Sequence, residues 1–361
     1  MIKTYTITLH DINNPGSSLQ AYALNRYINT ELKEVTNFII DYQPRYSKIG
    51  KNKIRGILRR VLYYKNEIMT DRKYRDFKKQ YMVCTEKYKS VDEMKRKLPQ
   101  AECYIVGSDQ LWNGDYDCGN DEAFYLDFVR GKKISYATSV GKSHISEKEI
   151  SKLRSSVSVF SHLSLREESS AKELSKILDR NVEWVCDPVF LLERADYEAL
   201  CSYNSNLDEK YAVVYMTAQS SLLDAAVNYA KREGLKVVQI DGNRKRCDCD
   251  IHVPSIGPCE FLGYIKNAEL VISSSFHATC FSLIFQRRFI VIPPEHNAER
   301  IYSILKLVNN MDRVVKKEED ILNASKMWDA ETAMICLKEF IMKSKQYLSK
   351  GIMNDDTFSC S

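Results

Sequence analysis

The chain has 361 residues, of which 44% are hydrophobic and 28% charged, and its formal net charge is +5. This balance is ordinary for a globular protein with room for two domains. A membrane-spanning chain is not expected, because no apolar run reaches the roughly 20 residues that cross a bilayer. The sequence starts with a strand-like segment and no signal-peptide pattern, and its eleven cysteines are scattered, so we expect a cytoplasmic protein with free thiols.

Strands and helices alternate through residues 1–192. A period-two strand is expected at 3–9, then a helix beginning near Ser18, then a strand at 35–41. Strands that end in polar turns or helices follow at 101–113, 132–141 and 162–178, and 182–192 closes this half. Residues 48–81 form a basic helical insertion with apolar side chains at helical spacing.

The same alternation continues through residues 193–350. Strands are expected at 211–218, 235–242, 268–275 and 287–294, separated by helices at 220–234, 259–268 and 277–285. Helices between strands predict parallel crossover units. We therefore expect an α/β fold of two doubly wound Rossmann-like domains that face a cleft, at 1–192 and 193–350, with a disordered tail at 351–361.

The insertion is strongly basic. Residues 48–79 contain twelve lysines and arginines against three acidic residues. Two interpretations stay open: a solvated helical face, or peripheral contact with an anionic membrane surface or a phosphate-bearing lipid at the inner face of the membrane. We find no nucleic-acid-binding motif and expect no nucleic-acid partner.

Polar clusters follow nearly every predicted strand. They lie at 13–18, 107–113, 137–141, 165–170, 186–188 and 273–279. In open parallel sheets, ligands bind outside the carboxyl ends of the strands. Six clusters at that position predict a ligand site between the two domains.

The cluster SSSFHAT lies where a buried strand passes into a helix. Ser274 and Ser275 can cap the helix or bind an anion at its N-terminus, and His277 can donate to an anion or transfer a proton. The simpler alternative is that the serines only cap the helix and His277 packs in the core.

The cluster NNPGSS repeats this arrangement in the first half. Gly16 allows a sharp turn, and Ser17 and Ser18 stand over the start of a helix. An anion site or plain turn chemistry would both explain it.

The cluster GSDQLWN combines a carboxylate, amides and an indole, which suit a sugar. Asp109 is the candidate general base, although a structural turn around a buried tryptophan is the alternative. The side chains expected to bind a sugar acceptor are Ser108, Gln110, Trp112, Asn113 and Ser139.

Arginines provide candidates for an anionic ligand. Arg166 ends a short strand and can bind a carboxylate or phosphate, unless it pairs with Glu167 or Glu168. Arg287 and Arg300 are further candidates. The segment Cys247–His252 lacks established zinc spacing, so we interpret it as a surface loop and expect no metal.

These stretches, in this order, resemble the polysaccharide pyruvyl transferase family from Leu9 to Arg313: NNPGSSLQAYAL, YIVGSDQLWN, ISYATSVG, SLREESS, CDPVFLL and EFLGYIKNAELVISSSFHATCFSLIF. The resemblance implies the two-Rossmann-domain GT-B architecture of glycosyltransferases. It also implies transfer of pyruvate from phosphoenolpyruvate, a co-substrate rather than a bound cofactor, onto a sugar of a cell-surface glycan such as an exopolysaccharide or its lipid-linked oligosaccharide precursor. The products are a pyruvate ketal and phosphate.

In this chemistry His277, which matches the family's motif histidine, would protonate the donor, and Asp109 would accept a proton from the sugar. Arg166, Ser274, Ser275, Gly16, Ser17 and Ser18 would bind the donor. Some members carry an arginine at the position of Ser275, so Arg287 or Arg300 would supply that charge here. The alternatives are a GT-B glycosyltransferase using a nucleotide sugar, and a non-catalytic partner in glycan assembly.

Overall fold

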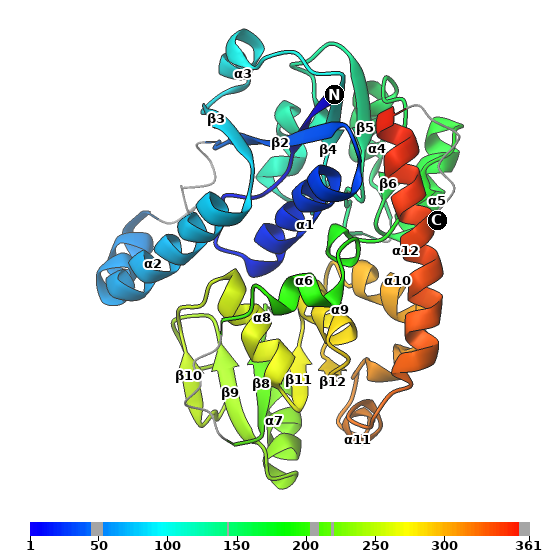
Figure 1. Cartoon of the computed structure of the whole chain (residues 1–361). Coiled ribbons are helices and arrows are strands. Elements are labelled where there is room, and N and C mark those ends of the chain that lie inside the picture. Colours follow the sequence, from blue (N-terminus) through cyan, green and yellow to red (C-terminus); the bar gives the residue numbers. More distant parts are fainter. Residues whose placement is uncertain (45–52, 143, 203–208, 218–219, 354–361) are drawn as a thin grey trace.

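The computed structural model describes residues 1–44, 53–142, 144–202, 209–217 and 220–353, with the backbone alone for 53–62 (Figure 1). The first half contains a parallel sheet in the order β3-β2-β1-β4-β5. Its strands are β1 (Ile2–Ile7), β2 (Val35–Tyr42), β3 (Cys84–Tyr88), β4 (Cys103–Val106) and β5 (Lys132–Ser135). Isolated bridges connect it to the short pair β6 (Ser164–Leu165) and β7 (Glu183–Trp184).

The second half repeats this topology, with the parallel order β10-β9-β8-β11-β12. Its strands are β8 (Tyr211–Tyr215), β9 (Lys236–Ile240), β10 (Ile251–Val253), β11 (Leu270–Ser273) and β12 (Arg288–Val291). In both sheets the first strand lies beside the fourth, so the chain reverses direction across the sheet at β1/β4 and at β8/β11. Such a switch point is where ligands bind in open α/β sheets.

The helices cover the sheets and connect the strands. They are α1 (Pro15–Glu31), α2 (Lys53–Tyr81), α3 (Val91–Lys97), α4 (Glu147–Val157), α5 (Glu168–Leu178), α6 (Arg194–Glu198), α7 (Leu222–Arg232), α8 (Pro258–Asn267), α9 (Phe276–Ile284), α10 (Glu299–Leu307), α11 (Asp320–Ala324) and α12 (Ala330–Met353). Short 3-10 turns are η2 (Asp117–Asn120), η3 (Glu122–Tyr125), η4 (Pro188–Phe190) and η5 (Met311–Arg313). None of the helices in the described ranges is both long and apolar enough to span a bilayer.

The predicted fold class is confirmed: the chain has two Rossmann-like α/β halves. The domain boundary at 192/193 stays a prediction. The tail prediction is wrong for residues 351–353, which continue α12, and 354–361 lie outside the described residues. The segment interpreted as a surface loop is also corrected, because its last residues begin the edge strand β10 and Cys249 is buried.

Two helices connect the halves. Helix α2 of the first half packs on the second half, where the Asn66 side chain donates to Asn243 at 3.2 Å and Thr70 donates to Ser255 at 2.8 Å. Helix α12, at the other end of the chain, packs on the first sheet: Tyr347 donates to the carbonyl of Ser135 at 2.9 Å. Figure 1 shows α12 running alongside both halves.

Candidate functional site

Two helix N-termini meet between the carboxyl ends of the two sheets. Helix α1 follows β1, and helix α9 follows β11. Gly16, in the first turn of α1, lies so close to His277 of α9 that a Cβ on Gly16 would overlap the imidazole ring. This close approach of the two helices requires glycine at position 16. The structure thus brings the NNPGSS and SSSFHAT clusters together.

The serines of the second cluster are used within the protein. Ser275 is the N-cap of α9 and accepts from the amide of Ala278 at 3.4 Å, while Ser274 accepts from the amide of Thr217 at 2.8 Å. These bonds fix the α9 N-terminus against the end of β8. The capping alternative is therefore correct for Ser275.

Asp109 follows β4 and has a φ of +83°. This backbone conformation is rare for residues other than glycine and asparagine. Its carboxylate accepts a hydrogen bond from the Ser17 hydroxyl and another, at 2.8 Å, from the backbone N–H of Gln110. Burial alone would raise the pKa of Asp109, but Arg166 and His277 favour the ionised form and hold it below its usual range. Asp109 is thus a buried, ionised carboxylate.

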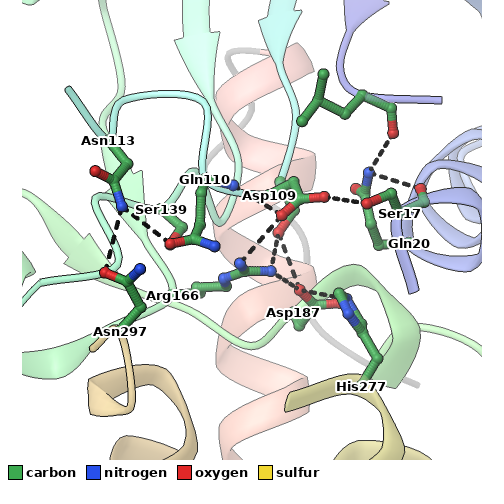
Figure 2. A network of polar contacts seen from close by, with 12 residues as sticks. Ser17, Gln20, Asp109, Gln110, Asn113, Ser139, Arg166, Asp187, His277 and Asn297 are labelled. Atoms are coloured by element: carbon green, nitrogen blue, oxygen red, sulfur yellow. Dashed lines mark hydrogen bonds and ion pairs between the residues drawn. The ribbon is translucent and has the colours of Figure 1, made fainter. Parts of the chain in front are cut away.

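Arg166 is fully buried and surrounded by carboxylates (Figure 2). Its guanidinium donates to Asp187 at 2.8 Å and lies 3.5 Å from both Asp109 and Glu167. Burial would lower the pKa of Arg166, but these carboxylates, Asp187 first, hold it above its usual value. The charge of Arg166 is therefore compensated inside the protein, and the predicted pairing with Glu167 is present.

Asp187 faces His277. Oδ2 of Asp187 lies 3.7 Å from Nε2 of His277 and also accepts from the Ser108 hydroxyl at 3.0 Å. Burial would raise the pKa of Asp187, but His277 and Arg166 hold it well below its usual range. We did not assign a role to Asp187 from the sequence, although its position after a strand, in the CDP cluster, could have indicated one.

Glu167 is the second functional candidate that sequence reasoning missed. It is completely buried, accepts from the Ser139 hydroxyl through Oε1, and has no hydrogen-bond partner for Oε2 among the described residues. Burial raises its pKa above the usual value, and Arg166 offsets part of this. The Glu167 carboxyl therefore favours its protonated form, whereas the carboxyls of Asp109 and Asp187 favour the ionised form.

The predicted amides lie at the edge of this network. Nδ2 of Asn113 donates to Gln110 at 3.0 Å and lies 3.5 Å from the side-chain oxygen of Asn297, which belongs to the second half (Figure 2). Ser18 is buried in the first turn of α1, where its amide donates to the carbonyl of Asn14 at 3.1 Å. The amides, rather than Ser18, are placed to reach across between the halves.

Two predicted ligand residues lie elsewhere. Trp112 is only 1% exposed, donates to the carbonyl of Phe124 at 2.9 Å and stacks on Tyr125, so it has no free face for a sugar. Arg287 precedes β12 and therefore lies at the amino end of that strand, away from the site. Its guanidinium donates to the carbonyl of Phe285 at 3.2 Å. Both assignments are corrected.

Arg300, at the start of α10, lies beside the network, unlike Arg287. It shares the ring of Phe276 with Arg166, with the two guanidinium carbons 5.8 Å and 4.8 Å from the ring centroid. Its Nε is buried without a hydrogen-bond partner in the described part of the chain. Burial and the charge of Arg166 lower its pKa. A half-buried arginine whose Nε is buried with an unused donor is suited to an anionic ligand.

The residues of the network match a known family. The model of the polysaccharide pyruvyl transferase family matches residues 14–296, which include both helix N-termini and the carboxylates between them. The chain belongs to this family. It is thus a member of an enzyme family of polysaccharide biosynthesis, as the motifs implied. A search of curated protein sequences found no match to this chain.

Solved structures of low sequence identity share the fold of this family member. MnaA of S. aureus, solved with UDP, has a TM-score of 0.54 at 13% identity, with 100% of each chain covered. The UDP-GlcNAc 2-epimerase of Neisseria meningitidis, bound to UDP-GlcNAc, has 0.50 at 10%, with 97% of each chain covered. Anabaena HepE, with UDP and glucose, has 0.52 at 6%, covering 98% of this chain and 100% of its own. These likenesses establish the GT-B architecture.

Proposed function

We propose that the protein transfers pyruvate from phosphoenolpyruvate to a pair of hydroxyls on a sugar of a cell-surface glycan or its lipid-linked precursor. The observation that carries this proposal is Arg300, whose buried Nε has no hydrogen-bond partner among the described residues and which lies beside the His277 and Asp109 network. Phosphoenolpyruvate carries a phosphate and a carboxylate, which this arginine suits. Arg300 would supply the charge that some family members place at the position of Ser275.

The reaction needs one acid and one base at the start. His277 gives a proton to the methylene carbon of the donor, and a sugar hydroxyl attacks the neighbouring carbon while its own proton passes to Asp109. The bond from that carbon to the phosphate oxygen then breaks, and the second hydroxyl closes the ketal. Of the two hydroxyl protons, one accounts for the new methyl group and the other leaves on phosphate, so the sum is balanced.

Asp187 and Arg166 would hold these groups in place. Oδ2 of Asp187 lies 3.7 Å from Nε2 of His277, so this buried carboxylate can hold the imidazole in position. Arg166 keeps Asp109 ionised and able to accept a proton. No described group of three His, Cys, Asp or Glu side chains is arranged to hold a metal ion.

The alternative donor, a nucleotide sugar, is less well supported. Helix α2 packs over the carboxyl ends of β9 and β10 through Asn66–Asn243 and Thr70–Ser255 contacts. This packing reduces the room for a nucleoside at that edge of the second sheet.

Titration calorimetry tests the donor. The purified protein should bind phosphoenolpyruvate and neither uridine nor guanosine diphosphate. Arg300→Ala should weaken this binding about 10- to 100-fold, the equivalent of a charged hydrogen bond, and Arg287→Ala should not, because Arg287 is remote. Binding of a nucleotide instead would make the protein a glycosyltransferase, and no binding of any would favour the non-catalytic role. Separately, His277→Ala should retain donor binding and lose phosphate release with an acceptor glycan.

We also propose that the protein is cytoplasmic and contacts the anionic inner face of the membrane through α2. The outward face of this helix carries exposed apolar side chains, Tyr64 (63% exposed), Ile68 (45%) and Met69 (51%). Lys65 and Arg72 are exposed beside them. Apolar and basic side chains together are the composition of helices that bind anionic interfaces. The basic residues Lys48 and Lys51 lie outside the described residues.

Sedimentation with vesicles tests this contact. The protein should sediment with vesicles of anionic phospholipid at low salt and stay in solution with neutral ones. Charge reversal at Lys65 and Arg72 should weaken sedimentation, since each basic side chain contributes about 1 kcal/mol at such a surface. A wild-type protein that ignores anionic vesicles would refute the membrane proposal and leave the donor assignment intact.

A further inference from the structure

A groove of about 1080 Å³ lies between α12 and the edge strand β7, outside the site described above. One wall is a stripe of α12 that includes Phe340 and Tyr347, and the other includes His162 and Trp184 of the first half. The strand lies near the middle of the chain and the helix near its C-terminal end. The groove therefore exists only because α12 returns to the first sheet.

Aromatic rings form its floor. Trp184 and Phe340 lie with ring centroids 4.5 Å apart, and His162 and Tyr347 with centroids 6.2 Å apart. The polar tips of two rings point into the protein: the indole of Trp184 donates to the carbonyl of Arg166 at 3.2 Å, and the hydroxyl of Tyr347 donates to Ser135. Because the tips are already bonded, these rings contribute carbon surface rather than polar atoms to the groove.

Planar polar side chains form its rim. Asn181 and Glu183 are exposed and bonded to each other at 2.6 Å. Across the groove, Glu339 and Lys343 of α12 are also exposed and paired at 2.7 Å. Donors and acceptors thus alternate around an aromatic floor.

Two of the three cations that line the groove, Arg180 and Lys343, are already engaged, which argues against an anionic ligand. The Arg180 guanidinium donates to the carbonyls of Ser158, Phe160 and Ser161 at 2.8 to 3.2 Å. Lys343 pairs with Glu339. A phosphate would have to break these bonds and would meet two carboxylates at the rim. A neutral polyhydroxyl chain can stack on the rings and bond to the rim as it stands.

We propose that this groove binds a neutral oligosaccharide segment. The inference stands on the groove's own side chains, so it does not depend on the identity of the donor. Where the proposed function holds, the ligand is a stretch of the glycan away from the reacting sugar. The bond from Trp184 to the carbonyl of Arg166 places the groove one residue from the ionised network.

Protection of Cys336, a half-buried cysteine that lines the groove, tests the proposal. The rate of its alkylation by iodoacetamide is measured by mass spectrometry with millimolar cellohexaose, chitohexaose or maltohexaose. At least one hexasaccharide should slow Cys336 and leave Cys247, a half-buried cysteine of the second half, unchanged. No protection by any of the three, or equal protection of both cysteines, would overturn the proposal, and so would protection by inorganic pyrophosphate alone.

Rim variants make the test specific. The exposed pair Asn181→Ala and Glu183→Ala, whose side chains bond to each other, should fold normally and raise the hexasaccharide concentration for half-protection about fivefold or more. Lys338→Ala, exposed on α12 outside the groove, is the matched control and should not change it. Equal behaviour of the two variants would contradict binding at this rim.

Discussion

Replacing Gly16 by alanine should destabilise the protein through a single contact. The added Cβ would overlap ring atoms of His277, and to reach ordinary contact the ring or the start of α1 would have to move by roughly 1 Å. Both groups sit on helices anchored in the core, so we expect the upper end of the overpacking range, about 3 kcal/mol lost from the free energy of unfolding. Urea denaturation of the purified variant measures it.

A double-mutant cycle isolates this contact. In a His277→Ala background the ring is gone, and the nearest remaining atom, the Cβ of residue 277, is 2.8 Å from the added methyl group. The cost of Gly16→Ala should then fall to about 1 kcal/mol, a coupling within the range for side chains in contact. Gly351→Ala is the matched control: its Cβ would lie 3.2 Å from the flexible end of Ile134, far from the site. An equal cost of Gly16→Ala in both backgrounds would refute the reasoning.

Two further predictions concern the buried carboxyls. Asp187→Asn leaves the buried Arg166 with less compensating charge and should lower the free energy of unfolding by about 3–5 kcal/mol. The control Asp248→Asn, at an exposed pair with Lys231, should cause no measurable loss. An Asp187→Asn protein as stable as wild type would contradict the ion-pair network. The raised pKa of Glu167 means that its contribution to stability is present at low pH and lost as the pH rises through that pKa. Wild type should therefore lose stability relative to Glu167→Gln between a pH near the usual glutamate pKa and a pH well above it. The opposite trend in urea denaturation at the two pH values would contradict a protonated Glu167.

The fold was predictable because its signal is local. Continuous apolar runs such as 103–106 and 270–272 identify buried parallel strands, and the polar clusters after them identify the carboxyl edge of each sheet. The clusters containing Gly16, Asp109, Arg166 and His277 do meet. The direction of β12 also predicts the position of Arg287: this residue precedes the strand, which places it at the amino edge of the sheet, opposite the site.

The rest of the site depends on contacts between residues far apart in the chain. Trp112 stands in a polar cluster, yet its indole fits the core against Tyr125, and residue type alone does not distinguish a stacking platform from a core ring. The pairing of Arg166 with its neighbour Glu167 was predicted, but its pairing with Asp187 is not encoded by any spacing in the sequence. Strand β10 is short and half-buried, with too little apolar pattern to separate it from a loop.

The crossing of α2 and α12 has a consequence for how the molecule comes apart. Each half is covered in part by a helix from the other half of the chain. Helix α2 packs on the second half through Asn66. Helix α12 packs on the first half through Tyr347 and through Ser344, whose hydroxyl accepts from the backbone N–H of Cys186 at 2.9 Å. If either half were expressed alone, it would expose the apolar surface that the helix of the other half covers, α12 for the first half and α2 for the second. The two Rossmann-like units should therefore melt together in one cooperative transition, and the chain is a poor candidate for division into separately folding pieces.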